Sequence, residues 1–131
     1  MTPQEMLLEA LHKIDAKNSQ DPIKVKVDGK EVASEVLYAQ RMTHWLFELN
    51  ASPSPELQVA VRANHIGRWE SPRKNYPMDR QGYLNWREDL ILHHQKTVMT
   101  LLTKKFKLFF KMAHHHPSLM RNHRLRHCHP N

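Results

Sequence analysis

The sequence is poor in the residues that mark several classes of protein. Cys128 is its one cysteine, so no disulfide can form within the chain, and the cytoplasm or another reducing compartment is expected. Three glycines and eight prolines in 131 residues exclude a collagen-like or low-complexity chain. No apolar run approaches the roughly 20 residues that a membrane span needs. The length and the 40% hydrophobic content together predict a single domain with a core of modest size.

Acidic residues are absent after Asp89, although the whole chain has a formal net charge of +7. Eight Lys and Arg residues lie between Lys96 and Arg126; the remaining 12 face 13 acidic residues, so residues 1–95 sum to −1. The basic character therefore belongs to the end of the chain and is no evidence that the domain binds nucleic acid. We expect residues 104–131 to form a basic, histidine-rich tail, partly helical and then disordered, which is the place to look for a nucleic-acid partner.

Apolar residues recur at helical spacing in four segments. The pattern predicts helices from residue 3 to about 17, over 32–49, from 56 to about 69, and from about 80 past 102. Between the first two, "IKVKVDGK" alternates apolar and basic residues, and we expect an extended connector closed by a turn at Asp28 and Gly29. A lone strand builds no sheet, so the predicted fold class is all-α, a single helical domain of about four main helices.

Polar residues interrupt the apolar faces of three of these helices. Arg41 lies four residues from both Leu37 and Trp45, which puts it in an apolar stripe, where it is either paired or extends its charged head to the surface. His65 lies on the next helix and His94 on the buried stripe of the last one. A single His on an apolar face is more often a hydrogen-bonded core residue than a ligand, but three converging polar groups are typical of a binding site.

Two stretches, "LYAQRMTHWL" and "VRANHIGRWESPRKNYPMDRQGYLNWREDLILHHQ", resemble the uncharacterised family named domain of unknown function 4202. The positions that carry the resemblance are Gln40, Arg41, Met42, Arg62, His65, Ile66, Arg68, Trp69, Glu70, Pro72, Arg73, Tyr76, Pro77, Met78, Gly82, Tyr83, Trp86, Arg87 and His94. The similarity covers roughly residues 3–102. It implies a helical family domain over residues 1–103. Family members continue with an acidic helical region that is not found here, so we interpret the chain as truncated relative to the family.

The arginines of these motifs suggest a pocket for a phosphorylated or other anionic small molecule, since each guanidinium offers paired donors to phosphate or carboxylate. Histidines add donors or a general acid, and tyrosines add stacking surfaces for a nucleotide or an RNA fragment. The candidate ligand-binding residues are Arg41, His65, Arg68, Arg73, Tyr76, Tyr83, Arg87 and His94.

Two alternatives remain open at this stage, and with them whether the protein is an enzyme. In the first, the chain is a non-catalytic helical interaction module, Glu70 pairs with Arg73 or Arg41, and the rings pin the loop to the helices. In the second, the fold is loosely similar to the HD-domain metal-dependent phosphohydrolases, and His65 and His94 bind a divalent metal. Here Ile66 follows His65 where that family has Asp, which leaves few ligands for a metal.

Overall fold

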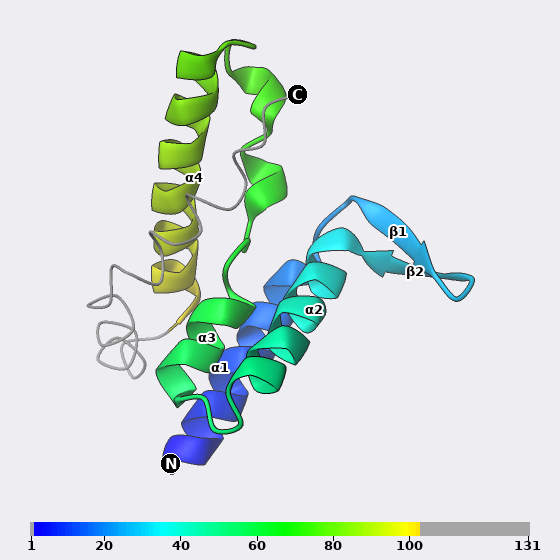
Figure 1. Ribbon diagram of the computed structural model, residues 1–131, viewed down its shortest axis with the longest axis vertical. Coiled ribbons are helices and arrows are strands. Elements are labelled where there is room, and N and C mark those ends of the chain that lie inside the picture. The colour runs from blue at the N-terminus through cyan, green and yellow to red at the C-terminus, as the bar shows by residue number, and fades with distance from the viewer. Residues whose placement is uncertain (1, 103–131) are drawn as a thin grey trace.

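The computed structural model describes residues 2–102, which form a helical assembly with one small β-hairpin (Figure 1). The elements in chain order are α1 (Pro3–Asn18), β1 (Lys24–Val27), β2 (Lys30–Ala33), α2 (Ser34–Leu49), α3 (Pro55–Arg62), the short 3-10 helices η1 (Arg68–Glu70) and η2 (Arg73–Asn75), and α4 (Arg80–Leu101). The predicted all-α class is thus confirmed in its main features. The expected basic tail lies outside the described residues.

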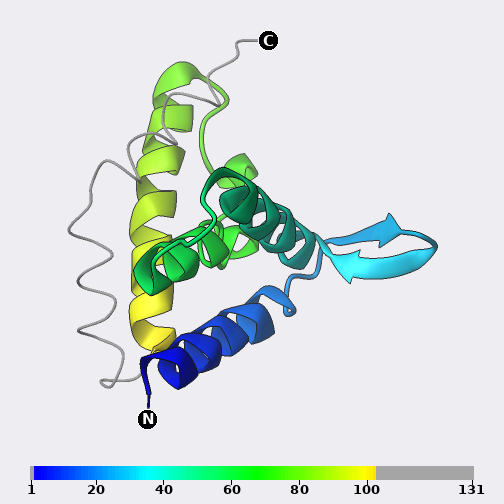
Figure 2. The same ribbon diagram turned by 60° about the horizontal axis from the view of Figure 1, so that its bottom comes forward.

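Helices α1, α3 and α4 share the main core. Figure 2 shows the C-terminal half of α4 lying against α1 and α3, while Figure 1 shows its other half extending beside η1 and η2. The buried side chains that fill this core are Leu7, Ala10, Ile14, Val59, Ala63, Ile66, Val98 and Leu102. Because Ile66 and Ala63 lie just after α3, the core fixes the start of the irregular segment that leads to η1.

Local capping explains where three of the helices begin. The Thr2 hydroxyl accepts from the backbone of Glu5, the Ser54 hydroxyl from Leu57 and the Asp79 carboxylate from Gly82. Proline follows directly in α1 and α3, where its missing N–H costs no hydrogen bond.

Arg62 joins three helices through one guanidinium. Its Nε and Nη2 donate to the two carboxylate oxygens of Asp15 on α1 at 2.6 and 2.9 Å, and its Nη1 donates to the Thr43 hydroxyl on α2 at 3.0 Å. Such a bidentate, charge-assisted pair fixes orientation as well as distance. Arg62, a motif residue, therefore has a structural role between α1, α2 and α3.

The expectation that residues 23–30 build no sheet was wrong. Strands β1 and β2 pair antiparallel, with Val25 opposite Val32, and the predicted turn joins them. Asp28 and Gly29 both have positive φ, as tight hairpin turns require. The partner strand went unrecognised because residues 32 and 33 fit equally well into the start of the following helix.

The third helix is also shorter than predicted. It ends at Arg62, and the chain turns through residues 63–67 before η1. Gly67 has a φ of +70°, which breaks any helix at this point. The apolar residues up to Trp69 had suggested a continuous helix. Ala63 and Ile66 are indeed buried, but they are buried by the turn and not by a helix.

Replacing Gly67 is expected to destabilise the fold more than replacing Gly29, although both have positive φ. A left-handed backbone costs an alanine about 1–2 kcal/mol at either position. A Cβ at Gly67 would also lie 2.7 Å from Glu70 Oε1 and 3.0 Å from His93 Nε2, whereas one at Gly29 meets nothing within 4 Å. Chemical denaturation of Gly67→Ala and of its matched control Gly29→Ala measures the difference; equal losses would show that the Gly67 contacts contribute nothing.

Candidate functional site

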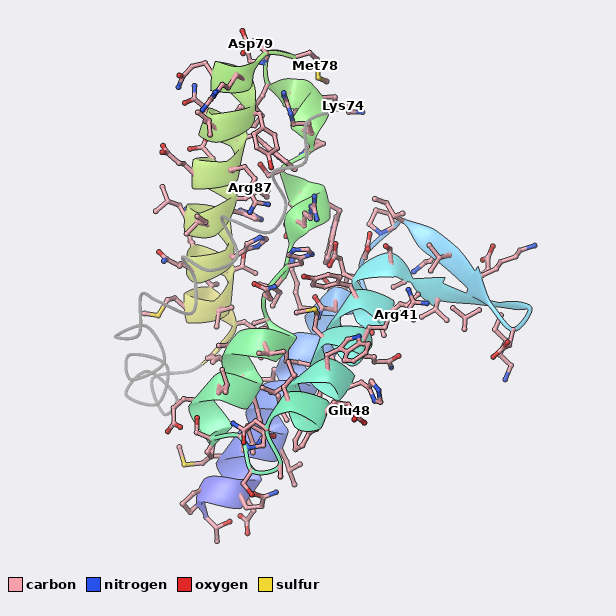
Figure 3. The ribbon with its side chains drawn as sticks, viewed as in Figure 1. Arg41, Glu48, Lys74, Met78, Asp79 and Arg87 are labelled. Carbon is pink, nitrogen blue, oxygen red and sulfur yellow. The ribbon has the colours of Figure 1, made fainter. Side chains whose placement is uncertain are left out.

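A cleft of about 410 Å³ opens between the start of α2, the turn before η1 and the first half of α4. The residues that line it are Ser34, Glu35, Tyr38, His65, Arg68, Tyr83, Trp86 and Arg87. In Figure 3, Arg87 lies on α4 beside the η1 segment. Three separate parts of the chain thus meet at this cleft.

Stacked rings form one wall of the cleft. The rings of Tyr38 and His65 are 3.8 Å apart and nearly parallel, with an interplanar angle of 6°. The Asn64 side chain donates to the Tyr38 hydroxyl at 3.2 Å. These contacts fix the plane of the His65 imidazole relative to α2.

Two arginines bring positive charge to the cleft. The Arg68 guanidinium lies over the Trp86 ring, 5.4 Å from its centroid, and its Nη1 is 3.5 Å from His65 Nδ1. The Trp86 ring is held in turn by its indole N–H, which donates to the Ser71 carbonyl at 2.8 Å. Within residues 2–102, neither Arg68 nor Arg87 forms an ion pair with a carboxylate.

Glu35 brings the single carboxyl group to the cleft lining. Its side chain is 12% exposed, and its Oε2 is 3.7 Å from His65 Nδ1. That oxygen is buried and accepts no hydrogen bond from the part of the chain that the structure describes. Burial raises the pKa of Glu35 to about 7; the Arg68 charge lowers it and the Asp21 charge raises it, both by less. Near neutral pH the carboxyl group therefore exists in both protonation states.

Two neighbouring histidines of α4 hold the turn that carries His65 and Arg68. His93 Nε2 is 3.0 Å from the Gly67 carbonyl and His94 Nδ1 is 2.6 Å from the Ile66 carbonyl, so each imidazole N–H donates to one carbonyl. Burial lowers the pKa of His94 to about 4, which keeps the ring neutral. Its ring lies 6.2 Å from that of His65, behind the cleft wall. His94 is therefore a positioning residue with a core hydrogen bond.

The structure brings half of the predicted site residues together. His65, Arg68, Tyr83 and Arg87 line the cleft, and His94 supports it. The side chain of Arg41 is exposed on α2, away from Arg87 in Figure 3, so of the two expectations for Arg41 the one that puts its head at the surface is confirmed.

Arg73 and Tyr76 stabilise the η2 segment instead. Arg73 Nη1 donates to the carbonyls of Tyr76 and Pro77 at 3.3 and 2.8 Å. The Tyr76 hydroxyl donates to Asp89 Oδ2 at 2.6 Å, which ties the segment to α4. These contacts match the structural role that the sequence left open for the motif.

Glu35 and Tyr38 line the cleft but were not predicted from the sequence. Both lie on α2 three residues apart, so they share one face of the helix. Tyr38 lies two residues before Gln40, in the stretch "LYAQRMTHWL" that carries the family resemblance, which was a usable signal. Glu35 carried none, because a glutamate in the first turn of a helix is ordinary.

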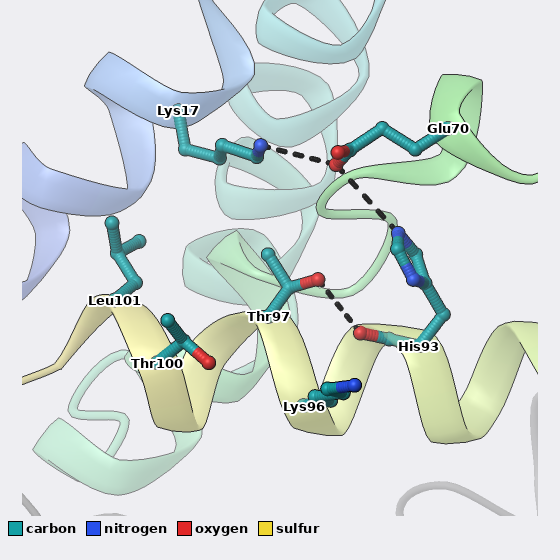
Figure 4. A pocket seen from close by; sticks show the side chains of 7 residues that line it. All are labelled: Lys17, Glu70, His93, Lys96, Thr97, Thr100 and Leu101. Atoms are coloured by element: carbon teal, nitrogen blue, oxygen red, sulfur yellow. Dashed lines mark hydrogen bonds and ion pairs between the residues drawn. The ribbon is translucent and has the colours of Figure 1, made fainter.

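A second pocket of about 440 Å³ lies on the other side of the Gly67 turn (Figure 4). At its centre Glu70 Oε1 is 3.0 Å from Lys17 Nζ and 3.6 Å from His93 Nε2. The expectation that Glu70 pairs with Arg73 or Arg41 was wrong, since its partner Lys17 comes from α1. The carboxylate is satisfied within the fold, so this pocket offers less to a ligand than the cleft.

The predicted metal ligands do not acquire a third partner. His65 and His94 are close, but no group of three or more His, Cys, Asp or Glu side chains in residues 2–102 is arranged to hold a metal ion.

Among residues 2–102, no helix has the length and apolar character that a membrane span requires.

Fold and cleft together define a helical protein with an arginine-lined cleft on one side. The chain matches the family described as domain of unknown function (DUF4202) over residues 8–127. It belongs to that family. The match runs well beyond residue 102, where we expected the similarity to end. Neither the curated proteins nor the solved structures contain a match.

Glu35 and His94 are expected to make the stability of the fold depend on pH in opposite directions. The folded pKa of Glu35, about 7, lies above its unfolded value of 4.5, so stability falls as pH rises through this window. The folded pKa of His94, about 4, lies below its unfolded value of 6.5, so stability is lost as pH falls through that window. The two effects oppose each other where the windows overlap.

Single substitutions should separate the two effects. As pH rises from about 5 to about 8, the wild type should lose on the order of 2 kcal/mol of unfolding free energy that Glu35→Gln does not lose. His94→Asn keeps a donor for the Ile66 carbonyl and should lose less stability than the wild type on acidification towards about pH 4. Urea denaturation across pH measures both; parallel profiles of the wild type and the variants would contradict the assignment.

Proposed function

We propose that the protein binds a small oxyanion, such as a phosphate group or a compact phosphorylated molecule, in the cleft between α2 and α4. The observation that carries this proposal is that Arg68 and Arg87 both line the cleft without a carboxylate partner among residues 2–102. Arginine is the side chain best suited to bind phosphate through paired donors.

The charge balance of the cleft supports an anionic ligand. Two guanidinium groups face one carboxyl group, and the pKa of Glu35 near 7 leaves that carboxyl partly neutral at physiological pH. A cleft wall with excess positive charge attracts anions and raises their local concentration. The other arginines of the motif differ in this respect, because Arg62 is paired with Asp15 and Arg73 is bonded to backbone carbonyls.

The aromatic rings of the cleft favour a compact ligand over a stacked base. Tyr38 is already stacked on His65, and Trp86 lies against the guanidinium groups of Arg68 and Arg73. Arg73 also lies 5.9 Å from the centroid of the Tyr83 ring. These rings orient cations and the imidazole, so the ligand's affinity is expected to come from hydrogen bonds and charge. The volume of about 410 Å³ accommodates an oxyanion with a small organic group.

A helical interaction module is the second candidate, on a separate observation. The C-terminal half of α2 exposes Trp45 and Leu49, which lie four residues apart on one face of the helix and are 60% and 85% exposed. Neighbouring apolar side chains exposed in this way are typical of a surface that contacts another protein. This surface lies on another part of α2 than Glu35 and Tyr38, so the two functions are compatible.

Isothermal titration of the protein with inorganic phosphate at low ionic strength tests the first proposal. Arg87→Gln should weaken binding by about tenfold or more, since a hydrogen bond to a charged group contributes about 1.5–3 kcal/mol. Arg41→Gln is the matched control: it removes the same charge from an exposed site outside the cleft and should change the affinity by less than about threefold. Equal losses in both variants, or no phosphate binding by the wild type, would refute the proposal.

A further inference from the structure

The carboxyl group of Glu35 is an unexpected component of a site for anions. It lines the same cleft as Arg68 and Arg87, is nearly buried, and has an oxygen without a hydrogen-bond donor in the described part of the chain. A carboxylate repels a ligand of its own charge sign, so its presence weakens the binding of most anions. It becomes favourable for one kind of anion, because a carboxylate accepts a hydrogen bond from an O–H that the ligand carries.

We propose that Glu35 makes the cleft selective for oxyanions that retain a proton of their own, so that phosphate binds and sulfate is rejected. This inference rests on the proposed function and names the ligand: inorganic phosphate, which as a dianion still carries one O–H. The arginines attract any oxyanion, and Glu35 distinguishes oxyanions that carry an O–H from those that do not.

Phosphate and sulfate differ in the one property that Glu35 detects. In mildly alkaline solution both are tetrahedral dianions, but phosphate retains one O–H and sulfate has none. Because Glu35 Oε2 is buried, the phosphate O–H donates to Oε1 of the carboxylate, whereas a sulfate oxygen would face Oε1 as a second acceptor. A site built to form such a hydrogen bond rejects an analogue that lacks the donor, because its own buried group is then left unpaired.

The groups that face Glu35 come from each element packed around it. Asp21, in the loop before β1, accepts from the backbone N–H of Glu35; Tyr38 lies one turn along α2. His65, Arg68 and Arg87 lie across the cleft. Burial raises the pKa of Glu35 most and the Asp21 charge raises it further, which favours the protonated carboxyl; the Arg68 charge lowers the pKa and favours the carboxylate.

The balance among these groups gives the selectivity a pH dependence. The pKa of Glu35 lies at about 7, so the carboxylate predominates at about pH 8 and the protonated form at about pH 5.5. A protonated Glu35 donates to either anion and carries no charge. Selectivity for phosphate over sulfate is therefore expected at the higher pH and is expected to disappear at the lower one.

Titration with sodium phosphate and sodium sulfate, at constant ionic strength maintained with chloride, tests the inference. The wild type should bind phosphate at least about tenfold more tightly than sulfate at about pH 8, and the ratio should fall below about threefold at about pH 5.5. Glu35→Gln is uncharged and its amide can both donate and accept, so it should bind the two anions within about threefold of each other at either pH.

Each outcome decides a different question. A tenfold ratio that persists in Glu35→Gln, or a wild-type ratio that does not change with pH, would overturn the role of Glu35 while leaving phosphate binding intact. Failure of the wild type to bind phosphate at either pH would overturn the proposed function and this inference with it. At about pH 8 both anions are dianions, so equal binding of phosphate and sulfate by the wild type there would overturn the inference even if Glu35→Gln does not fold, which circular dichroism reports.

Discussion

The geometry of the cleft depends on two adjacent imidazole groups that bind two consecutive carbonyls. His93 donates to Gly67 and His94 to Ile66, at the point where the chain has left α3 and has not yet entered η1. Without the His94 bond the buried Ile66 carbonyl would have no donor within residues 2–102, which is costly in a core, whereas the Gly67 carbonyl also accepts from the backbone N–H of Glu70. Because His65 and Arg68 flank the two carbonyls, the same bonds set the distance of the cleft residues from α4.

Arginine serves two purposes in this fold, and its partners distinguish them. Arg62 and Arg73 are satisfied by the protein itself, one by Asp15 and the other by backbone carbonyls. Arg68 and Arg87 lie in the cleft with rings and an imidazole around them and without a carboxylate partner within residues 2–102. A motif rich in arginine is therefore no uniform sign of ligand binding; the pairing of each guanidinium decides its role.

Local signals predicted what is local in this structure. The helix starts at Pro3, Pro55 and Arg80 follow from a capping residue and its neighbours, so the sequence predicted them closely. The hairpin was missed because its second strand fits equally well into the start of α2. The early end of α3 and the Lys17–Glu70 pair depend on the left-handed Gly67 and on a partner far away in the chain, and periodicity carries no information on either. Half of the cleft residues were predicted, because the motif contained His65, Arg68, Tyr83 and Arg87. Glu35 joins them only because α2 packs against the Gly67 turn.

The buried carboxylate of Asp21 has a consequence for how this domain tolerates change. Its two oxygens accept from the backbone N–H groups of Ile23 and Glu35, at either end of the hairpin. The base of the hairpin is thereby closed independently of the strands, and α2 is capped by a residue that precedes them. The hairpin is closed at its base, so its length and sequence can change, or it can accept an inserted peptide, without displacing the helix that carries Glu35.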